Sequence, residues 1–372
     1  MHRHASIDRG LAILIGLLIV AGCMIFSSAA LGLLARGQIG MQAIVFNHLV
    51  LGIGAGLVLL VVGSQIDYHR WRPVAPYIFG FAIFLTALVF IPHLGAVHGG
   101  GRRWIVLGRL SLQPSEGLKL AGILAASAYF AAIRDKISNL KYGFGGFAAI
   151  LALPAIMLVL QPDLGTLGVI VSGVGVTFFM AGARVRDLAL ILLCGFLALA
   201  LMAAVRPYVR DRVMTFFHPS AGAQGEGYQI RQSLIAIGSG GFLGRGFGQG
   251  VQKFTYLPEP MGDSIFAVAG EELGFVGGVT LILGFLILAL RGFSIAARSP
   301  DLFGALLASG LSATLVSEAF INIAAMLGIV PLTGIPLTFV SQGGSAILVS
   351  LASAGILLNV SKFAKKSVKM QG

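Results

Sequence analysis

Long apolar runs alternate with short polar segments along almost the whole chain. About ten runs hold roughly 20 apolar residues each, the length that an α-helix needs to cross a hydrocarbon layer of about 30 Å. Lipid offers no partner to backbone N–H and C=O groups, so each run is expected to be a helix. The pattern predicts an all-α polytopic membrane protein with about ten transmembrane helices, forming a single domain over residues 1–372. The runs lie near residues 11–33, 42–63, 73–92, 115–133, 142–160, 164–182, 187–205, 263–290, 302–326 and 343–361.

One connection between these runs is much longer than the others. It covers about residues 206–262, between the seventh and eighth predicted helices. Basic residues gather in alternate connections, and the positive-inside rule then places both termini in the cytoplasm and this segment outside. The first run exceeds the core of a signal peptide, which predicts an uncleaved first helix.

Composition supports the same class. Hydrophobic residues make up 57% of the chain and charged residues 11%, whereas a soluble domain is about one quarter charged. Cys23 and Cys194 both lie inside apolar runs, so neither suggests a disulfide or a metal site. The net charge of +12 is scattered over short connections, which favours topology and contact with anionic lipid over a nucleic-acid partner.

Two predicted outer segments are basic against the positive-inside rule. The segments cover residues 98–116 and 206–262. Long loops cross the membrane regardless of charge, so the basic residues of 206–262 are weak evidence against the topology. Basic groups on the outer side suit an anionic ligand. These groups are Arg102, Arg103, Arg109, Arg206, Arg210, Arg212, Arg231, Arg245 and Lys253.

The fourth run opens with "QPSEGLKL", which contains Glu116 and Lys119. These residues are three apart, on one helical face, and are expected to pair. The pair serves either to balance charge in lipid or to give a lysine that meets a substrate in a polar pocket. Ionisable groups inside a membrane are candidates for function by default.

Two further outer motifs each allow two interpretations. In "QPDLGT", Asp163 is expected to cap the following helix, with a salt bridge to an outer arginine as the alternative. "IGSGGFLGRGFGQG", residues 237–250, matches no nucleotide-binding motif. It is either a re-entrant or tightly turned loop, or a loop that lines a cavity around phosphates or sugars.

Asp263 begins the eighth run, directly after Pro258 and Pro260. It is either a helix cap or a general base near the outer water line. A base alone suffices where the leaving group is already good, as a diphosphate is. Glu271 and Glu272 lie about 12 Å further along a helix, too far for a glycosidase-like pair, and are expected to pair or hydrogen-bond within the bundle.

The segment before the last run, "GIVPLTGIPLTFVSQGGSA", is rich in proline and glycine. It is either a turn or a broken helix that lines the same cavity with Ser341, Gln342 and Ser345. Upstream, Glu318 and Asn322 are four apart on one helical face and are expected to point into the bundle.

Taken together, these motifs resemble the SEDS family of bacterial shape, elongation, division and sporulation proteins. The similarity covers essentially the whole chain, which resembles the division-type members, FtsW and its sporulation relative, more than the elongation-type RodA. Its last loop departs from the family pattern, with Thr338 in place of a proline and Gln342 in place of a tyrosine, while Glu318 stands where glutamine is common. The motifs are "GRRWIVLG", "QPSEGLKLA", "QPDLGT", "GEGYQIRQSLIAIGSGGFLGRGFGQGVQKFTYLPEPMGDSIFAVAGEELGF" and "NIAAMLGIVPLTGIPLTFVSQGGS".

This resemblance implies a peptidoglycan glycosyltransferase that polymerises lipid II at the outer face of the bacterial cytoplasmic membrane, during division or elongation. It also implies a class B penicillin-binding protein as partner, with other divisome or elongasome membrane proteins. In the family, the aspartate at the position of Asp263 is catalytic, and the residues at the positions of Glu116 and Lys119 line the central cavity.

We therefore expect Asp263 to deprotonate the sugar hydroxyl that attacks the second lipid II molecule. Lys119 is expected to serve the diphosphate, and a divalent cation held by Asp263 is a further possibility, although no ligand cluster demands one. Other expected substrate contacts are Ser341, Gln342, Ser345, Arg102, Arg103, Arg210 and Arg212. The alternatives are a lipid II flippase, which would make no glycan strands, and a divisome scaffold without chemistry.

Overall fold

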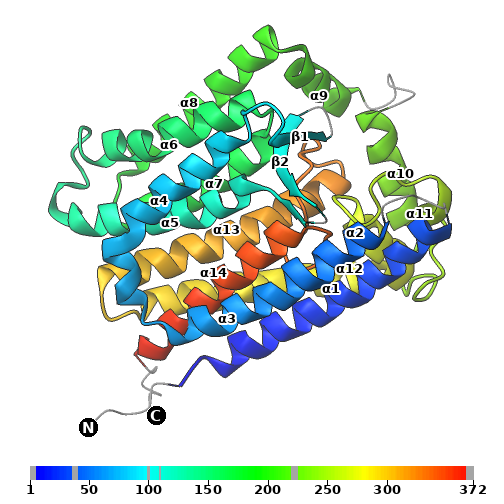
Figure 1. Cartoon of the computed structure of the whole chain (residues 1–372), viewed down its shortest axis with the longest axis horizontal. Coiled ribbons are helices and arrows are strands. Elements are labelled where there is room, and N and C mark those ends of the chain that lie inside the picture. Colours follow the sequence, from blue (N-terminus) through cyan, green and yellow to red (C-terminus); the bar gives the residue numbers. More distant parts are fainter. Residues whose placement is uncertain (1–5, 36–40, 99–100, 109, 219–224, 366–372) are drawn as a thin grey trace.

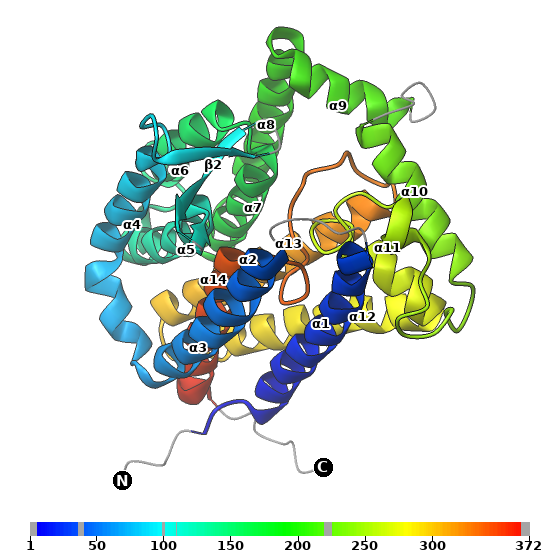
Figure 2. The same cartoon turned by 45° about the vertical axis from the view of Figure 1, so that its right-hand side comes forward.

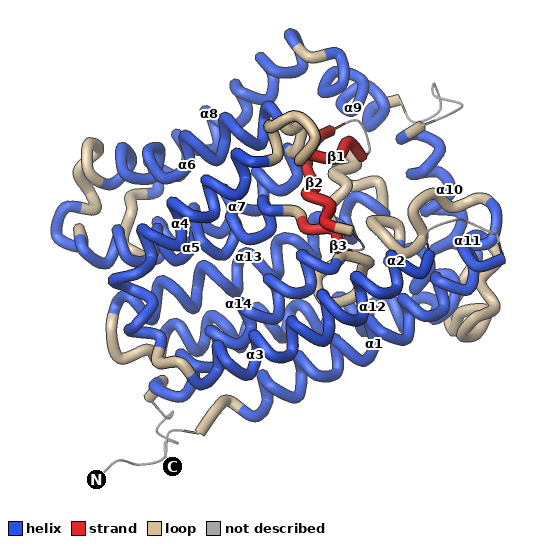
Figure 3. The backbone as a smooth tube through the Cα atoms, viewed as in Figure 1, coloured by secondary structure: helices blue, strands red, loops and turns tan. Residues whose placement is uncertain are grey.

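A computed structural model of the protein describes residues 6–35, 41–98, 101–108, 110–218 and 225–365 (Figure 1). Helices dominate it, and helical segments occupy all ten predicted positions (Figure 3). The second run is built from α2 (Met41–Phe46), a π-helix η1 (Asn47–Ala55) and α3 (Gly56–Gln65). The other nine are α1 (Arg9–Ala35), α4 (Trp71–Leu88), α5 (Pro114–Ala132), α6 (Gly143–Leu160), α7 (Leu164–Met180), α8 (Val185–Val205), α12 (Ile265–Ala297), α13 (Leu302–Met326) and α14 (Gly344–Phe363).

Eight helical stretches of the described residues are long and apolar enough to cross a membrane. Helix α7 is apolar but has only 17 residues, and α5, which begins with polar residues, falls outside this set. The chain is therefore a multi-pass membrane protein, while the total of ten spans stays a prediction.

Helices α13 and α14 form the centre of the bundle, with α5, α7 and α12 packed around them (Figures 1 and 2). Most side chains of α13 are buried, including the polar Ser309, Ser312 and Asn322. Helix α8 stands at the edge, and residues such as Leu192 and Phe196 are exposed there. A largely apolar helix is either buried by protein or exposed to lipid. Helix α13 is the buried case, and α8 is the exposed one.

The first and last described residues lie at one end of the bundle, which we call the termini end (Figure 1). There the Asp8 amide donates to Ser361 Oγ at 3.0 Å and the Tyr68 amide donates to Asn359 Oδ1 at 2.8 Å. The turn after α12 joins them, since the Lys365 amide donates to the Arg298 carbonyl. Helix α12 therefore begins at the opposite end of the bundle.

The opposite end carries a small antiparallel sheet that the sequence analysis did not predict. Its strands β1 (Gly95–His98), β2 (Gly101–Leu107) and β3 (Leu110–Leu112) are ordered β1–β2–β3. The same end holds the segment 206–262, which folds into α9 (Pro207–Phe217), α10 (Glu226–Ser239) and α11 (Gln252–Thr255) rather than a simple loop.

Helix α12 is broken at Gly274, where φ is +66°. The carbonyls of Glu271 and Glu272 accept the amides of Arg245 and Gly246, both at 3.0 Å, and the Phe275 amide donates to the glycine segment in return. A Cβ at Gly274 would lie 2.2 Å from the amide nitrogen of Gly244, so only glycine fits. The glycine-rich segment is thus a tightly turned loop docked on the break in α12.

Candidate functional site

Asp263 lies two residues before α12, in a turn built by the sequence Pro–Glu–Pro. Glu259 has a φ of +43°, and its carbonyl accepts the amides of Gly262 at 3.0 Å and Ser264 at 3.2 Å. The N-cap residue of α12 is Ser264 and makes no side-chain cap. The alternative of Asp263 as a helix cap therefore does not describe its place in the fold.

Two other elements hold this turn. Gln229 of α10 donates from Nε2 to Asp263 Oδ1 and to Ser264 Oγ, both at 2.9 Å. Asn322 of α13 donates from Nδ2 to the Asp263 carbonyl at 2.8 Å and to the Ile335 carbonyl at 2.7 Å. The carboxylate is thus fixed where α10, α13 and the loop before α14 meet.

Burial raises the pKa of Asp263 to about 7, and the neighbouring carboxylate of Glu259 acts in the same direction. The hydrogen bond from Gln229 opposes both effects. Within the part of the chain that the structure describes, Asp263 forms no ion pair. A carboxyl with a pKa near neutral is suited to accept a proton during a reaction.

The loop before α14 contacts this turn directly. Ser341 Oγ donates to the Gly262 carbonyl and accepts the Leu337 amide, both at 2.7 Å. The Gln342 amide donates to the Met261 carbonyl at 2.6 Å. Ser341 and Gln342 therefore lie beside Asp263, and the segment between α13 and α14 is a turn rather than a helix.

Ser345 lies in a neighbouring polar network. Its Oγ accepts the amide of Gln113 at 3.2 Å, and the Gln113 side chain donates to Asp163 Oδ2 at 3.1 Å. Asp163 caps α7 by accepting the Thr166 amide at 3.2 Å, as the motif predicted. The network joins the starts of α5, α7 and α14.

The predicted pair of Glu116 and Lys119 is confirmed and has a third member. Lys119 Nζ lies 2.7 Å from Glu116 Oε2 and 2.8 Å from Glu318 Oε2, and all three side chains are buried. Glu318 comes from α13, so the cluster ties α5 to α13 with two carboxylates around one ammonium group.

A second buried cluster explains Glu271 and Glu272. Glu272 Oε1 lies 2.5 Å from Lys253 Nζ, and Ser28 of α1 bonds to both groups. Glu271 accepts the amides of Val251 at 2.8 Å and Gln252 at 3.1 Å. The prediction that these glutamates pair or hydrogen-bond within the bundle is confirmed.

The predicted arginines are dispersed. Arg103 of β2 donates to the carbonyls of Gln161 and Pro162, while Arg102 is exposed. Arg210 of α9 borders a pocket of about 380 Å³ against α8, and Arg212 lies over the ring of Tyr208 at 4.4 Å. Arg109 falls outside the described residues. The structure therefore gives Arg103 a structural contact and leaves the substrate contacts of the others as predictions.

Sequence reasoning missed the roles of Gln229 and Glu259 near Asp263. Both lie in the segment 225–275 that carries the family resemblance, but neither residue type signals a contact with a particular partner. No group of three or more His, Cys, Asp or Glu side chains that could hold a metal ion is present among the described residues.

Comparisons with known proteins agree with this architecture. Residues 9–366 match the family model FTSW_RODA_SPOVE, described as cell cycle protein. The chain is 40% identical to stage V sporulation protein E of Bacillus subtilis, over 84% of this chain and 85% of that one. It is 36% identical to the peptidoglycan glycosyltransferase MrdB of Escherichia coli, over 94% and 92%.

Solved structures show the same fold. One, titled as the structural coordination of polymerization and crosslinking by a peptidoglycan synthase complex, matches with a TM-score of 0.76 and 31% identity, over 95% of this chain and 97% of that one. The rod shape determining protein RodA of Thermus thermophilus matches with a TM-score of 0.71 and 28% identity, over 97% and 98%. The chain belongs to the FtsW/RodA/SpoVE family of cell cycle proteins, the SEDS family that its motifs indicated.

Proposed function

We propose that this protein is a peptidoglycan glycosyltransferase that polymerises lipid II into glycan strands at the outer face of the bacterial cytoplasmic membrane. Relatives that match over most of the chain are named as peptidoglycan glycosyltransferases, which supports the enzyme class. The observation that carries the proposal is Asp263, a carboxyl with a pKa near neutral held at a junction of three elements.

In the proposed reaction, Asp263 accepts the proton of the acceptor sugar's 4-hydroxyl as that oxygen attacks the anomeric carbon of the donor. A new glycosidic C–O bond forms while the bond from the anomeric carbon to the diphosphate breaks. The polyprenyl diphosphate leaves with the bonding electrons. General-base catalysis is sufficient because the diphosphate is a good leaving group.

The surrounding residues have positioning and charge roles in this proposal. Gln229 and Asn322 fix the carboxylate and its backbone. Lys119, with Glu116, and the exposed Arg102 are the proposed partners of the diphosphate or glycan. The same role is proposed for Arg210 and Arg212 on α9, for Ser341 and Gln342 beside the Asp263 turn, and for Ser345 in the neighbouring network.

The proposal extends to topology and partners. Both termini lie in the cytoplasm and the segment 206–262 lies outside, in agreement with the charge pattern. The match to a peptidoglycan synthase complex supports a class B penicillin-binding protein as partner, together with other divisome or elongasome membrane proteins. The proposed partners associate with a single transmembrane domain that comprises residues 1–372.

The decisive experiment is Asp263→Asn, assayed for glycan strands from purified lipid II at equal enzyme concentration. Loss of the base should reduce polymerisation by roughly 10²- to 10⁴-fold. Asp163→Asn is the matched control, because it makes the same change at the same end of the bundle and asparagine retains capping ability. The control should keep most of its activity.

Two outcomes would overturn the proposal. A stable Asp263→Asn protein that polymerises at nearly the wild-type rate would exclude Asp263 as the general base. A wild-type protein that makes no strands, alone or with its partner, but moves lipid II across vesicle membranes is a flippase.

A further inference from the structure

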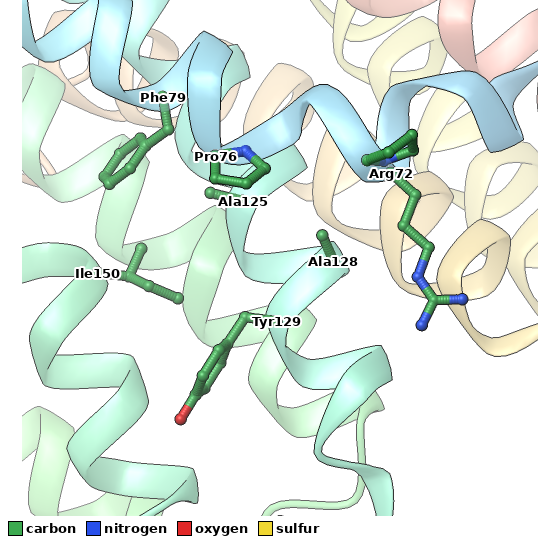
Figure 4. A pocket seen from close by; sticks show the side chains of 8 residues that line it. Arg72, Pro76, Phe79, Ala125, Ala128, Tyr129 and Ile150 are labelled. Carbon is green, nitrogen blue, oxygen red and sulfur yellow. The ribbon is translucent and has the colours of Figure 1, made fainter.

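A pocket of about 580 Å³ lies between α4, α5 and α6 (Figure 4). It lies toward the termini end, where α4 begins beside Asn359. Its floor is made by the small residues Ala125 and Ala128 of α5, and its sides by Pro76 of α4 and Ile150 of α6. Because alanine and proline fill little space here, the three helices leave a slot with almost wholly apolar walls. Its volume is typical of sites for small organic ligands, roughly 300–1,000 Å³.

The pocket has a cationic mouth. Arg72, in the first turn of α4, lines it and is exposed, and within the described residues it forms no ion pair. Figure 4 shows its guanidinium at the edge of the residues that line the pocket, away from Phe79 and Ile150. The long side chain thus offers a positive charge at the end of an apolar slot.

More positive charge surrounds this mouth. Tyr129, which lines the pocket, donates from Oη to the Tyr142 carbonyl at 3.0 Å. Lys136 and Lys141 lie 5.3 and 6.0 Å from the centre of the Tyr142 ring. Asp135 is the single acidic residue of the α5–α6 connection, so basic groups dominate this edge.

The helix faces beside the pocket carry large exposed apolar side chains. Tyr77 and Phe81 of α4 are 78% and 61% exposed, and Ile156 of α6 is 57% exposed. Such surfaces on membrane-spanning helices face lipid. A ligand for this pocket therefore arrives from the bilayer rather than from water.

We propose that this pocket binds an anionic phospholipid, with an acyl chain in the slot and the phosphate at Arg72. Apolar walls match the chain, and the arginine with its neighbouring lysines matches the negative headgroup. The site lies at the end of the bundle opposite Asp263, so it is separate from the proposed lipid II site and does not depend on the proposed function. The bound lipid would brace α4 and α6 against α5.

The test is native mass spectrometry of the purified full-length protein in detergent, with dioleoyl phosphatidylglycerol and dioleoyl phosphatidylcholine in equal amounts. Wild-type protein should retain phosphatidylglycerol preferentially. Arg72→Gln should lower that preference roughly fivefold, the size expected for one basic group at an anionic surface. Arg184→Gln, an exposed arginine before α8, is the matched control and should leave the preference unchanged.

A second measurement covers the slot. Phosphatidylglycerol with a photoreactive group in its acyl chain should crosslink to peptides of α5 and α6, and Ala128→Leu should reduce this labelling. Equal retention of the two lipids by wild type, or an effect of Arg184→Gln as large as that of Arg72→Gln, would overturn the headgroup assignment. Labelling that is displaced by lipid II and confined to other helices would overturn the site.

Discussion

Two buried lysines in this protein form ion pairs with glutamates, but the two ion pairs stabilise different parts of the fold. Lys119 lies between Glu116 and Glu318, so side chains alone tie α5 to α13. Lys253 lies against Glu272, which also accepts the Gly248 amide at 3.0 Å. The first cluster joins two helices, whereas the second folds a loop.

The difference lies in what the carboxylates are used for. In the first cluster two carboxyl groups share one ammonium group, so Lys119 keeps a partner if one of them is removed. In the second, both oxygens of Glu272 have donors, since Gly248, Lys253 and Ser28 all bond to it. We therefore expect the first cluster to tolerate loss of a carboxylate and the second to depend on each one.

The largest effect is expected from Lys119→Met. Removing the cation leaves two buried carboxylates facing each other, and breaking a buried pair in this way costs about 3–5 kcal/mol of stability. Thermal or SDS-induced unfolding of the purified protein measures it. The triple variant that adds Glu116→Gln and Glu318→Gln should recover much of the loss. An unchanged stability of Lys119→Met alone would mean that the cluster is hydrated.

Glu272→Gln should have the next largest effect. An amide has one acceptor oxygen where the carboxylate has two, so either the loop amide or Lys253 loses a partner. The expected cost is about 1–3 kcal/mol, with faster proteolysis within residues 237–250. If proteolysis of residues 237–250 is no faster than in the wild type, the backbone hydrogen bonds to the break in α12 are sufficient to hold this loop. Glu226→Gln, in the neighbouring α10, is the control: it makes the same substitution and should change neither the stability nor the rate of proteolysis in this way.

Glu318→Gln should be nearly neutral or stabilising, by less than about 1 kcal/mol. It removes one of the two carboxyl groups and leaves Lys119 paired with Glu116. A buried ion pair often contributes little net stability. The comparison is sharpest if the same unfolding assay is run beside Glu272→Gln. A loss as large as that of Lys119→Met would show that both carboxylates are needed for the helix contact.

The smallest effect concerns pH. Wild-type polymerisation should rise as the pH passes through about 7, because the base must be deprotonated. Glu259→Gln removes a like charge, so the midpoint should move to lower pH, by less than about one unit because Glu259 is exposed and screened by solvent. The pH profile of the initial rate measures this shift, and a midpoint that moves upward would contradict the stated origin of the raised pKa.

Stability should follow the opposite course with pH. The pKa of Asp263 is raised in the folded protein, so the folded state binds more protons than the unfolded one between about pH 4 and 7. The stabilisation present below pH 4 is therefore lost as the pH rises through about 7. Asp263→Asn should abolish this component of the pH dependence, which unfolding at several pH values can measure.

Much of the fold could be predicted from the sequence because hydrophobic length is a local signal. All ten apolar runs form helical segments, and the bounds of α13 agree with the predicted 302–326. The sheet was missed because its three strands have only four, seven and three residues, which is too short for a clear alternating pattern, even though each pairs with its neighbour in the chain. The π-helix within the second run has no sequence signal of its own.

The candidate site was predictable at its centre and not at its edges. Asp263 could be singled out because an acidic residue directly precedes an apolar run, and the family resemblance then favoured a base over a helix cap. Its partners Gln229 and Asn322 are 34 and 59 residues away in the chain, and amides pair in too many ways for sequence to choose between them. Arg103 was expected to meet a substrate, but its guanidinium is engaged by backbone carbonyls that only the fold brings near.

The break at Gly274 has a consequence for how the protein enters the membrane. Helix α12 has 33 residues, about 50 Å at the usual rise, but residues 275–297 alone are about 34 Å long. That part contains one charged residue, Arg291, and is sufficient to be inserted as a span during synthesis. The two glutamates precede it, and Lys253 leaves the ribosome before either of them. In the proposed topology, Lys253 and its partner Glu272 therefore lie together on the outer side of this span, outside the part that must be inserted.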